Sequence, residues 1–212
     1  MNRSYPTTGY NVPQKNVLLI SCIDLRLTDD LVRFMNHENL TNRYDHFILA
    51  GASLSASLER LPDWCYTDSD NACGKVNTSK FDFVSWQNTL DNHLDIAMAL
   101  HHIDTVYIIK HENCGAYSAF VKDKILSKKT EKGCQHESAW RLAEKIEQTK
   151  KKQICRDGEM VEVPLTVHCF WMDLRCNVEF MPRITAPQSF TTTPTSFEPN
   201  MKKIVPDTPA HA

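Results

Sequence analysis

Short, almost continuous apolar runs recur along the first half of the chain. They are "NVLLISC" at 16–22, "DHFILAG" at 45–51 and "TVYIIK" at 105–110. Runs of this length and composition are typical of strands that are buried on both faces of a sheet. The pattern therefore predicts three buried strands, the second of which ends at Gly51.

Segments with a helical period separate and follow these strands. "LTDDLVRFMN" at 27–36 places apolar residues on one face, with Thr28 as an acceptable N-cap. "SWQNTLDNHLDIAMALHHI" at 85–103 reads as an amphipathic helix, and "ESAWRLAEKIEQTKKK" at 137–152 as a second long helix with a highly charged face. The pattern predicts one helix in each segment.

The pattern returns to strands after the turn "RDGEM". We expect one strand over 162–174 and an antiparallel hairpin partner within 175–181. Strands that alternate with helices predict an α/β fold with a mostly parallel central sheet flanked by helices. In such folds ligands bind beyond the carboxyl ends of the strands.

The chain divides into three parts by composition. Residues 1–13 form an N-terminal arm, residues 14–182 a folded domain, and residues 183–212 a tail rich in Pro and Thr. Within the domain, Pro, Gly, Asn, Asp and Ser cluster at 54–80, which indicates an insertion or long loop. The total of 212 residues is enough for one sizeable core.

Composition and charge narrow the possible partners. Hydrophobic residues make up 42% and charged residues 24%, which is ordinary for a globular protein. The 24 basic and 26 acidic side chains leave a net charge of −2, so nothing favours nucleic acid or a membrane surface as a partner. The sequence shows neither an apolar span of ~18 residues nor a signal-peptide core, and we expect a cytoplasmic protein.

The eight cysteines carry no familiar spacing. Their gaps are irregular and no CxxC occurs, which disfavours zinc ribbons and thioredoxin-like motifs. In a reducing compartment most should be small buried thiols. Cys65 and Cys73 are close enough in sequence to pair if oxidised, but free thiols are expected.

Three soft ligands follow two of the predicted strands. Cys22 ends the first strand, His111 ends the third, and Cys114 lies one turn further on. Since the carboxyl ends of parallel strands meet at one edge of a sheet, these side chains should converge. Two cysteines and a histidine suit zinc, which keeps three protein ligands and a water in catalytic sites and four protein ligands in structural ones.

Two opposite charges accompany Cys22. Asp24 is close enough to supply a fourth ligand or to bind a metal-bound water, and Arg26 could hold it in a bidentate ion pair. Ile23 and Leu25 alternate with these residues and are expected to point into the packing. The alternative is that the thiols are merely buried, the histidine is satisfied in its loop and the ion pair is structural. A nucleophilic cysteine is disfavoured because no glycine-containing anion loop follows Cys22.

The segments "CIDLR" and "HENCGA" together resemble the β-class carbonic anhydrases, whose signature is C-x-D-x-R followed downstream by H-x-x-C-G. The resemblance covers roughly residues 14–182. It implies a zinc ion bound by Cys22, His111 and Cys114. It also implies that Asp24, a catalytic residue together with Arg26, moves between the zinc and Arg26.

The resemblance further implies the activity: reversible hydration of CO2 to bicarbonate and a proton through a zinc-bound hydroxide. It also implies a homodimer or a higher homo-oligomer. A hydrolase of COS or CS2 that uses the same zinc site is one alternative. A non-catalytic zinc-binding homologue with an interaction or regulatory role is another.

The sequence departs from the family pattern around the ligands. The interval between Cys22 and His111 is longer than in the family, and Lys110 stands where a glycine commonly precedes the ligand histidine. Ala116 replaces the second glycine after the ligand cysteine. These changes leave the three metal ligands intact and alter the residues around them.

Overall fold

The computed structural model describes residues 15–56, 81–120 and 130–183. The predicted N-terminal arm, the C-terminal tail beyond Arg183 and most of the predicted insertion lie outside these ranges, as do Cys65 and Cys73. Within them, no helix is both long and apolar enough to cross a membrane.

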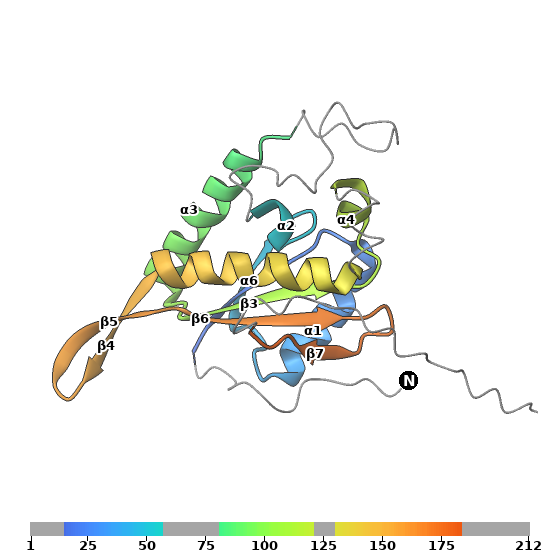
Figure 1. The fold of residues 1–212 in the computed structure, drawn as a ribbon. Helices are drawn as coiled ribbons and strands as arrows, with labels where there is room; N and C mark the ends of the chain where they lie inside the picture. The colour runs from blue at the N-terminus through green and yellow to red at the C-terminus, as the bar shows by residue number, and fades with distance from the viewer. Residues whose placement is uncertain (1–14, 57–80, 121–129, 184–212) are drawn as a thin grey trace, which may run out of the picture.

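A five-stranded sheet in the order β2-β1-β3-β6-β7 forms the centre of the fold. The first four strands are parallel and β7 pairs antiparallel with β6, so the predicted α/β fold with a mostly parallel sheet is confirmed (Figure 1). The strands are β1 Val17–Ser21, β2 Tyr44–Ile48, β3 Thr105–His111, β6 Thr166–Met172 and β7 Val178–Phe180.

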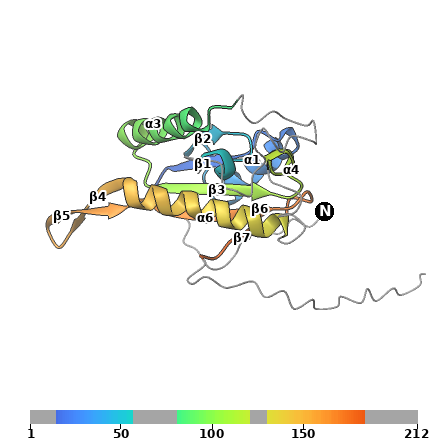
Figure 2. The same cartoon turned by 45° about the horizontal axis from the view of Figure 1, so that its top comes forward.

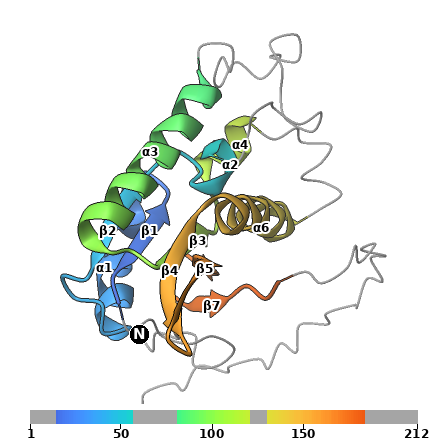
Figure 3. The same ribbon diagram turned by 90° about the vertical axis from the view of Figure 1, so that its left-hand side faces the viewer.

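Helices cover both faces of this sheet. Helix α1 (Thr28–His37) packs on one face through residues such as Phe34 and Leu31. Helices α3 (Phe83–His101) and α6 (Glu131–Thr149) lie on the other face, which Figure 3 shows from the side. Because successive residues of β1 and β3 serve opposite layers, both strands are buried along their whole lengths.

Short helical elements gather at the carboxyl end of the parallel strands. They are the 3₁₀ turn η1 (Leu25–Leu27), α2 (Ser53–Ala56) and α4 (Gly115–Phe120). Each follows a strand end or a ligand predicted from the sequence, so this edge of the sheet holds the candidate chemistry.

The charged helix and the strand after it differ from the prediction. Helix α6 begins at Glu131 and ends at Thr149, and the lysine run continues into strand β4 (Lys151–Arg156). Strand β4 pairs antiparallel with β5 (Glu159–Pro164), so the single strand expected over 162–174 is two strands. The β4–β5 ribbon projects from the body of the molecule (Figures 1 and 2).

The turn between β4 and β5 explains why the sequence pattern did not predict this hairpin. Asp157 and Gly158 both have positive φ, 53° and 86°, which an Asp-Gly pair adopts readily in a two-residue hairpin turn. The Asp-Gly signal was present in the sequence but was interpreted only as a break between a helix and a strand.

Two smaller expectations were also wrong. Strand β2 is only partly buried, because in the described part of the chain it lies at the edge of the sheet with β1 as its single neighbour. Thr28 does not cap α1: the N-cap is Leu27, which makes no side-chain capping hydrogen bond, because η1 leads directly into the helix.

Stability should fall as pH drops from about 6.5 to about 4. Burial lowers the pKa of His168, which packs against the Tyr107 ring, from 6.5 to about 4. Between these pH values His168 binds a proton in the unfolded chain but not in the folded one. Its contribution therefore lowers the free energy of unfolding by about 1.4 kcal/mol per pH unit of acidification. Urea unfolding across this range should give a shallower fall for His168→Gln. Equal slopes in the two proteins would contradict the assignment.

Candidate metal centre

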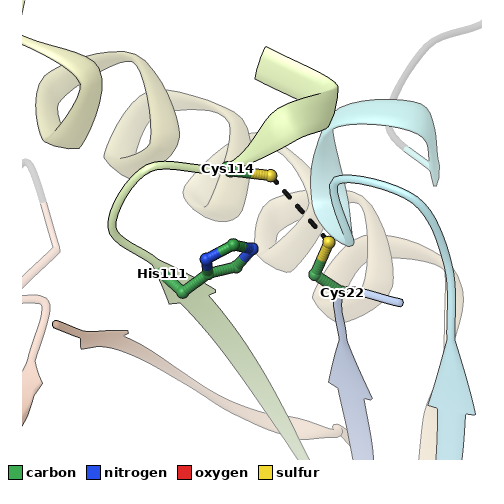
Figure 4. Close-up of side chains that lie close together, drawn as sticks. All are labelled: Cys22, His111 and Cys114. Carbon is green, nitrogen blue, oxygen red and sulfur yellow. Dashed lines mark hydrogen bonds between the residues drawn. The ribbon is translucent and has the colours of Figure 1, made fainter. Parts of the chain in front are cut away.

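Three side chains converge at the carboxyl edge of the sheet. Cys22 directly follows β1, His111 is the last residue of β3, and Cys114 precedes α4 (Figure 4). Their ligand atoms all lie within 4.8 Å of one another, and the two sulfurs are 3.9 Å apart. Among the residues that the structure describes, this is the one such group that could hold a metal ion.

The convergence follows from strand pairing and one tight turn. Strands β1 and β3 are parallel neighbours, with Val17 opposite Thr105, so their carboxyl ends emerge together. After His111 the chain reverses through Asn113, which has a φ of 55°. Asparagine tolerates this left-handed conformation better than most residues, and the reversal returns Cys114 towards His111.

The histidine presents one nitrogen to the site. The Nδ1 atom of His111 lies 2.9 Å from the carbonyl oxygen of Glu112 and donates to it, which leaves Nε2 as the unprotonated nitrogen. That Nε2 atom is buried and has no hydrogen-bond partner in the described structure. Since a buried polar atom normally has a partner, the unpartnered Nε2 atom indicates that this nitrogen serves to bind a metal ion.

The two thiols share a proton. The pKa of Cys22 is lowered, chiefly because the Cys114 thiol donates to its sulfur, with His111 and the N–H of Gly51 adding to the effect. The pKa of Cys114 is raised because its proton is held in that bond and because it is buried. The pair therefore offers a negative charge beside the imidazole, which a metal cation would neutralise.

This donor set fits a tetrahedral zinc ion. Two sulfurs bound to zinc at about 2.3 Å lie roughly 3.8 Å apart at the tetrahedral angle, close to the separation in the structure. Thiolate and imidazole are the ligands that zinc takes most often, whereas Mg²⁺ and Ca²⁺ prefer oxygen. Three protein ligands would leave a fourth position open.

Asp24 lies beside this open side and is held by Arg26. Arg26 donates from Nε to Oδ1 at 2.9 Å and from Nη2 to Oδ2 at 2.6 Å. Arg26 Nη2 also donates to the carbonyl oxygen of Asn113 at 2.9 Å, which ties the ion pair to the turn that carries the ligands. The Oδ2 atom of Asp24 is 3.9 Å from Nε2 of His111.

The electrostatics of Asp24 follow from these bonds. Hydrogen bonds from the Arg26 side chain lower the pKa of Asp24 to about 2, with the Arg26 backbone N–H adding to the effect. The carboxylate is therefore ionised throughout the physiological range and acts as a hydrogen-bond acceptor. Its Oδ1 atom also accepts a hydrogen bond from the Arg26 backbone N–H at 3.1 Å, which caps η1 and fixes the position of the carboxylate.

The residues between these charges do not enter the core, contrary to the sequence prediction. Ile23 is 63% exposed and Leu25 is 86% exposed. The strand ends at Ser21 and the chain then turns into η1, so the strict alternation of a strand no longer applies. Two apolar side chains consequently lie on the surface next to the site.

Helix α6 supplies two further residues that sequence reasoning missed. The carboxylate of Glu131 accepts hydrogen bonds from the N–H groups of Asn113, at 2.9 Å, and Cys114, at 2.7 Å. Gln135 donates from Nε2 to the carbonyl oxygen of His111 at 2.7 Å, and its Oε1 accepts from the backbone N–H of His111 at 3.3 Å. These two side chains fix the turn from His111 to Cys114.

Glu131 and Gln135 were missed because the predicted helix began at 137. The available signal was Thr130, whose side chain caps α6 by accepting from Gly133 N. Even with the correct start, no local pattern indicates that the first turns of this helix contact a loop some twenty residues earlier.

Lys110 is the clearest departure from the resemblance and is almost wholly buried. Its Nζ donates to the carbonyl oxygen of Gly51 at 2.5 Å and lies 4.7 Å from the centre of the Tyr117 ring. A side chain where the family commonly has glycine thus reaches behind the metal centre rather than into it.

Sequence comparison finds relatives of unassigned activity. No family model matches the chain. An uncharacterized protein of Rickettsia bellii is 27% identical over 141 residues, which cover 66% of this chain and 73% of the relative. An uncharacterized protein of Rickettsia conorii is 25% identical over 141 residues, covering 66% of this chain and 64% of the relative.

Structure comparison finds carbonic anhydrases at low similarity. A β-carbonic anhydrase of Trichomonas vaginalis gives a TM-score of 0.43 at 12% identity, covering 82% of this chain and 86% of that one. A carbonic anhydrase of Glaciozyma antarctica gives 0.39 at 14% identity, covering 81% and 86%. A tetrameric β-carbonic anhydrase of Sordaria macrospora gives 0.40 at 11% identity, covering 81% and 83%. Likeness at this level assigns no activity, so a functional proposal must rest on the residues of the site.

Proposed function

We propose that this protein is a zinc enzyme that reversibly hydrates CO2 to bicarbonate and a proton, in the manner of the β-class carbonic anhydrases. One observation carries the proposal: a buried group of two thiols and an unpartnered imidazole nitrogen has an ionised, arginine-held carboxylate at its open side. A structural zinc site has no need of that carboxylate, which favours catalysis over a non-catalytic zinc-binding role.

The three ligands would hold zinc through Cys22 Sγ, Cys114 Sγ and His111 Nε2. Bound zinc supplies Lewis acidity that brings the pKa of a water molecule from about 15.7 towards 7, and so provides a nucleophile at neutral pH. Glu131 and Gln135 keep the turn that carries two of the ligands in place through the bonds described above.

The role of Asp24 follows from its charge and position. An ionised carboxylate can only accept hydrogen bonds, so a water molecule at the open position would donate its hydrogen to Asp24 and turn a lone pair away from it, towards CO2. Arg26 keeps this acceptor ionised and oriented, because both oxygens of Asp24 are engaged by its guanidinium. While these two bonds persist, Asp24 would stay paired with Arg26 and would leave the fourth position to water.

The assembly is also part of the proposal. Ile23 and Leu25 place exposed apolar surface next to the site, which a second copy of the chain would cover in a homodimer or larger homo-oligomer. The cytoplasmic location stays a prediction from the sequence.

One prediction of this proposal concerns the metal itself. Protein purified under reducing conditions without chelators should carry about one zinc ion per chain by elemental analysis. Cys114→Ser should lose most of this zinc, because a hydroxyl does not ionise to replace the thiolate. Cys155→Ser is the matched control: this exposed cysteine on β4 lies outside the cluster, and its loss should leave the zinc content unchanged.

Two results would speak against the metal centre. One is wild-type protein that neither contains zinc nor takes it up. The other is a Cys114→Ser variant that keeps the full zinc content.

Another prediction concerns Asp24. Stopped-flow CO2 hydration by Asp24→Asn should be slower than by wild type by roughly 10²-fold or more, since the amide can donate and no longer holds the water in one orientation. Zinc content should be unchanged. Asp29→Asn, an equivalent change at an exposed residue of α1, should retain wild-type rates.

A protein loaded with zinc that hydrates no CO2 would overturn the anhydrase proposal. Turnover of COS or CS2 by that same protein would then assign the site to the hydrolase alternative. Equal rates for Asp24→Asn and wild type would remove Asp24 from the mechanism while leaving the metal centre intact.

A further inference from the structure

Lys110 is a basic side chain enclosed in the core. It lies on β3 directly before His111 and is 1% exposed. Its side chain lies on the α3 and α6 side of the sheet, since its neighbours at alternate positions, Ile108 and Val106, belong to that core. Burying an ammonium group costs folding free energy unless nearby groups compensate its charge. The groups that contact Lys110 therefore indicate what the side chain does.

The contacts of the ammonium belong to elements that surround the metal centre. The carbonyl oxygen of Gly51 accepts from Nζ, and the face of the Tyr117 ring lies against it. Gly51 closes the loop between β2 and α2, and Tyr117 lies in α4, which begins directly after Cys114. Lys110 thus bridges two segments that pack around the ligands.

Gly51 connects this lysine to a ligand. While its carbonyl oxygen accepts from Lys110, its N–H donates to the sulfur of Cys22 at 3.3 Å. Its φ of +71° is a conformation that only glycine adopts without strain, and a Cβ there would lie 3.0 Å from the Cβ of Ala116. The position therefore admits only glycine, whose backbone is the least restricted of any residue, so the bond to its carbonyl oxygen limits the conformations from which its N–H can face Cys22.

We propose that Lys110 is a positioning residue of the metal centre, which holds Gly51 in the orientation in which its N–H donates to the Cys22 sulfur. The lysine acts from behind the ligands and touches neither the metal position nor the substrate. This inference rests on the proposed zinc centre but not on the identity of the substrate.

The test compares Lys110→Met with wild type and with Lys132→Met. Methionine keeps most of the length of the lysine side chain but removes its donors and charge. Lys132 is the control for loss of a lysine over an aromatic ring: its Nζ lies 5.5 Å from the Trp171 ring and pairs with Glu179 at the surface, away from the three candidate ligands in the described structure. Three quantities are measured: the zinc Kd by chelator competition, the thiolate-to-metal absorption of the Co²⁺-substituted protein, and the urea midpoint of the metal-free protein.

Lys110→Met should weaken zinc binding by roughly 10- to 100-fold, as the loss of outer-shell hydrogen bonds usually does. The thiolate-to-cobalt band should shift, since the Cys22 sulfur loses an oriented donor. The urea midpoint of the metal-free protein reports separately on the core: the buried Gly51 carbonyl oxygen loses its Lys110 donor, so the midpoint can fall whether or not metal binding changes. Lys132→Met should match wild type in zinc affinity and in the cobalt spectrum.

An unchanged zinc Kd and cobalt spectrum, with a lowered urea midpoint, would make Lys110 a structural residue only and overturn the inference. A wild-type protein that binds no zinc would instead overturn the proposed function. If Lys110→Met does not fold, Lys110→Gln is judged in the same way. Its amide is too short to reach the Gly51 carbonyl oxygen, so weaker zinc binding supports the inference and wild-type affinity overturns it.

Discussion

Parallel pairing of β1 with β3 is the constraint on which the candidate site depends. With Val17 opposite Thr105, both strands run to the same edge of the sheet, where one delivers Cys22 and the other delivers His111. A slip of one residue in either strand would turn its last side chain to the opposite face and separate the ligands. The apolar layers on both faces fix that register, so the hydrophobic core also fixes the geometry of the metal centre.

The edge of the sheet is then stabilised from three directions. Helix α6 holds the ligand turn through Glu131 and Gln135, and Arg26 ties Asp24 to the carbonyl of Asn113. Lys110 contacts the loop before α2 on the side of the sheet that α3 and α6 cover. Each contact joins segments that are distant in sequence, and together they fix the backbone that carries the three candidate ligands.

The sequence predicted the parts of this arrangement that follow from period and from strand ends. Continuous apolar runs predict β1 and β3, and the rule that the carboxyl ends of parallel strands meet at one edge predicts that Cys22 and His111 lie close together. The hairpin partner after β6 was also predicted correctly. These features depend on local patterns and on one general property of parallel sheets.

Other features depended on contacts that a linear pattern does not encode. The start of α6, and with it Glu131, lay outside the predicted helix, and the lysine run that continues into β4 has the same composition as a solvated helix face. The alternation assumed for Ile23 failed because the strand ends earlier than its apolar run suggests. Lys110 was recognised only as a departure from a motif, since nothing in the sequence shows that its ammonium meets Gly51.

In the proposed site, a zinc ion is bound by the sulfurs of Cys22 and Cys114 and by the imidazole of His111, and its fourth position is open to water. X-ray absorption at the zinc edge of the purified protein tests it directly. The predicted first shell contains two sulfur atoms at about 2.3 Å and two nitrogen or oxygen atoms at about 2.0–2.1 Å, one from His111 and one from water or Asp24. A shell of four sulfurs, or one with no sulfur at all, would contradict the account.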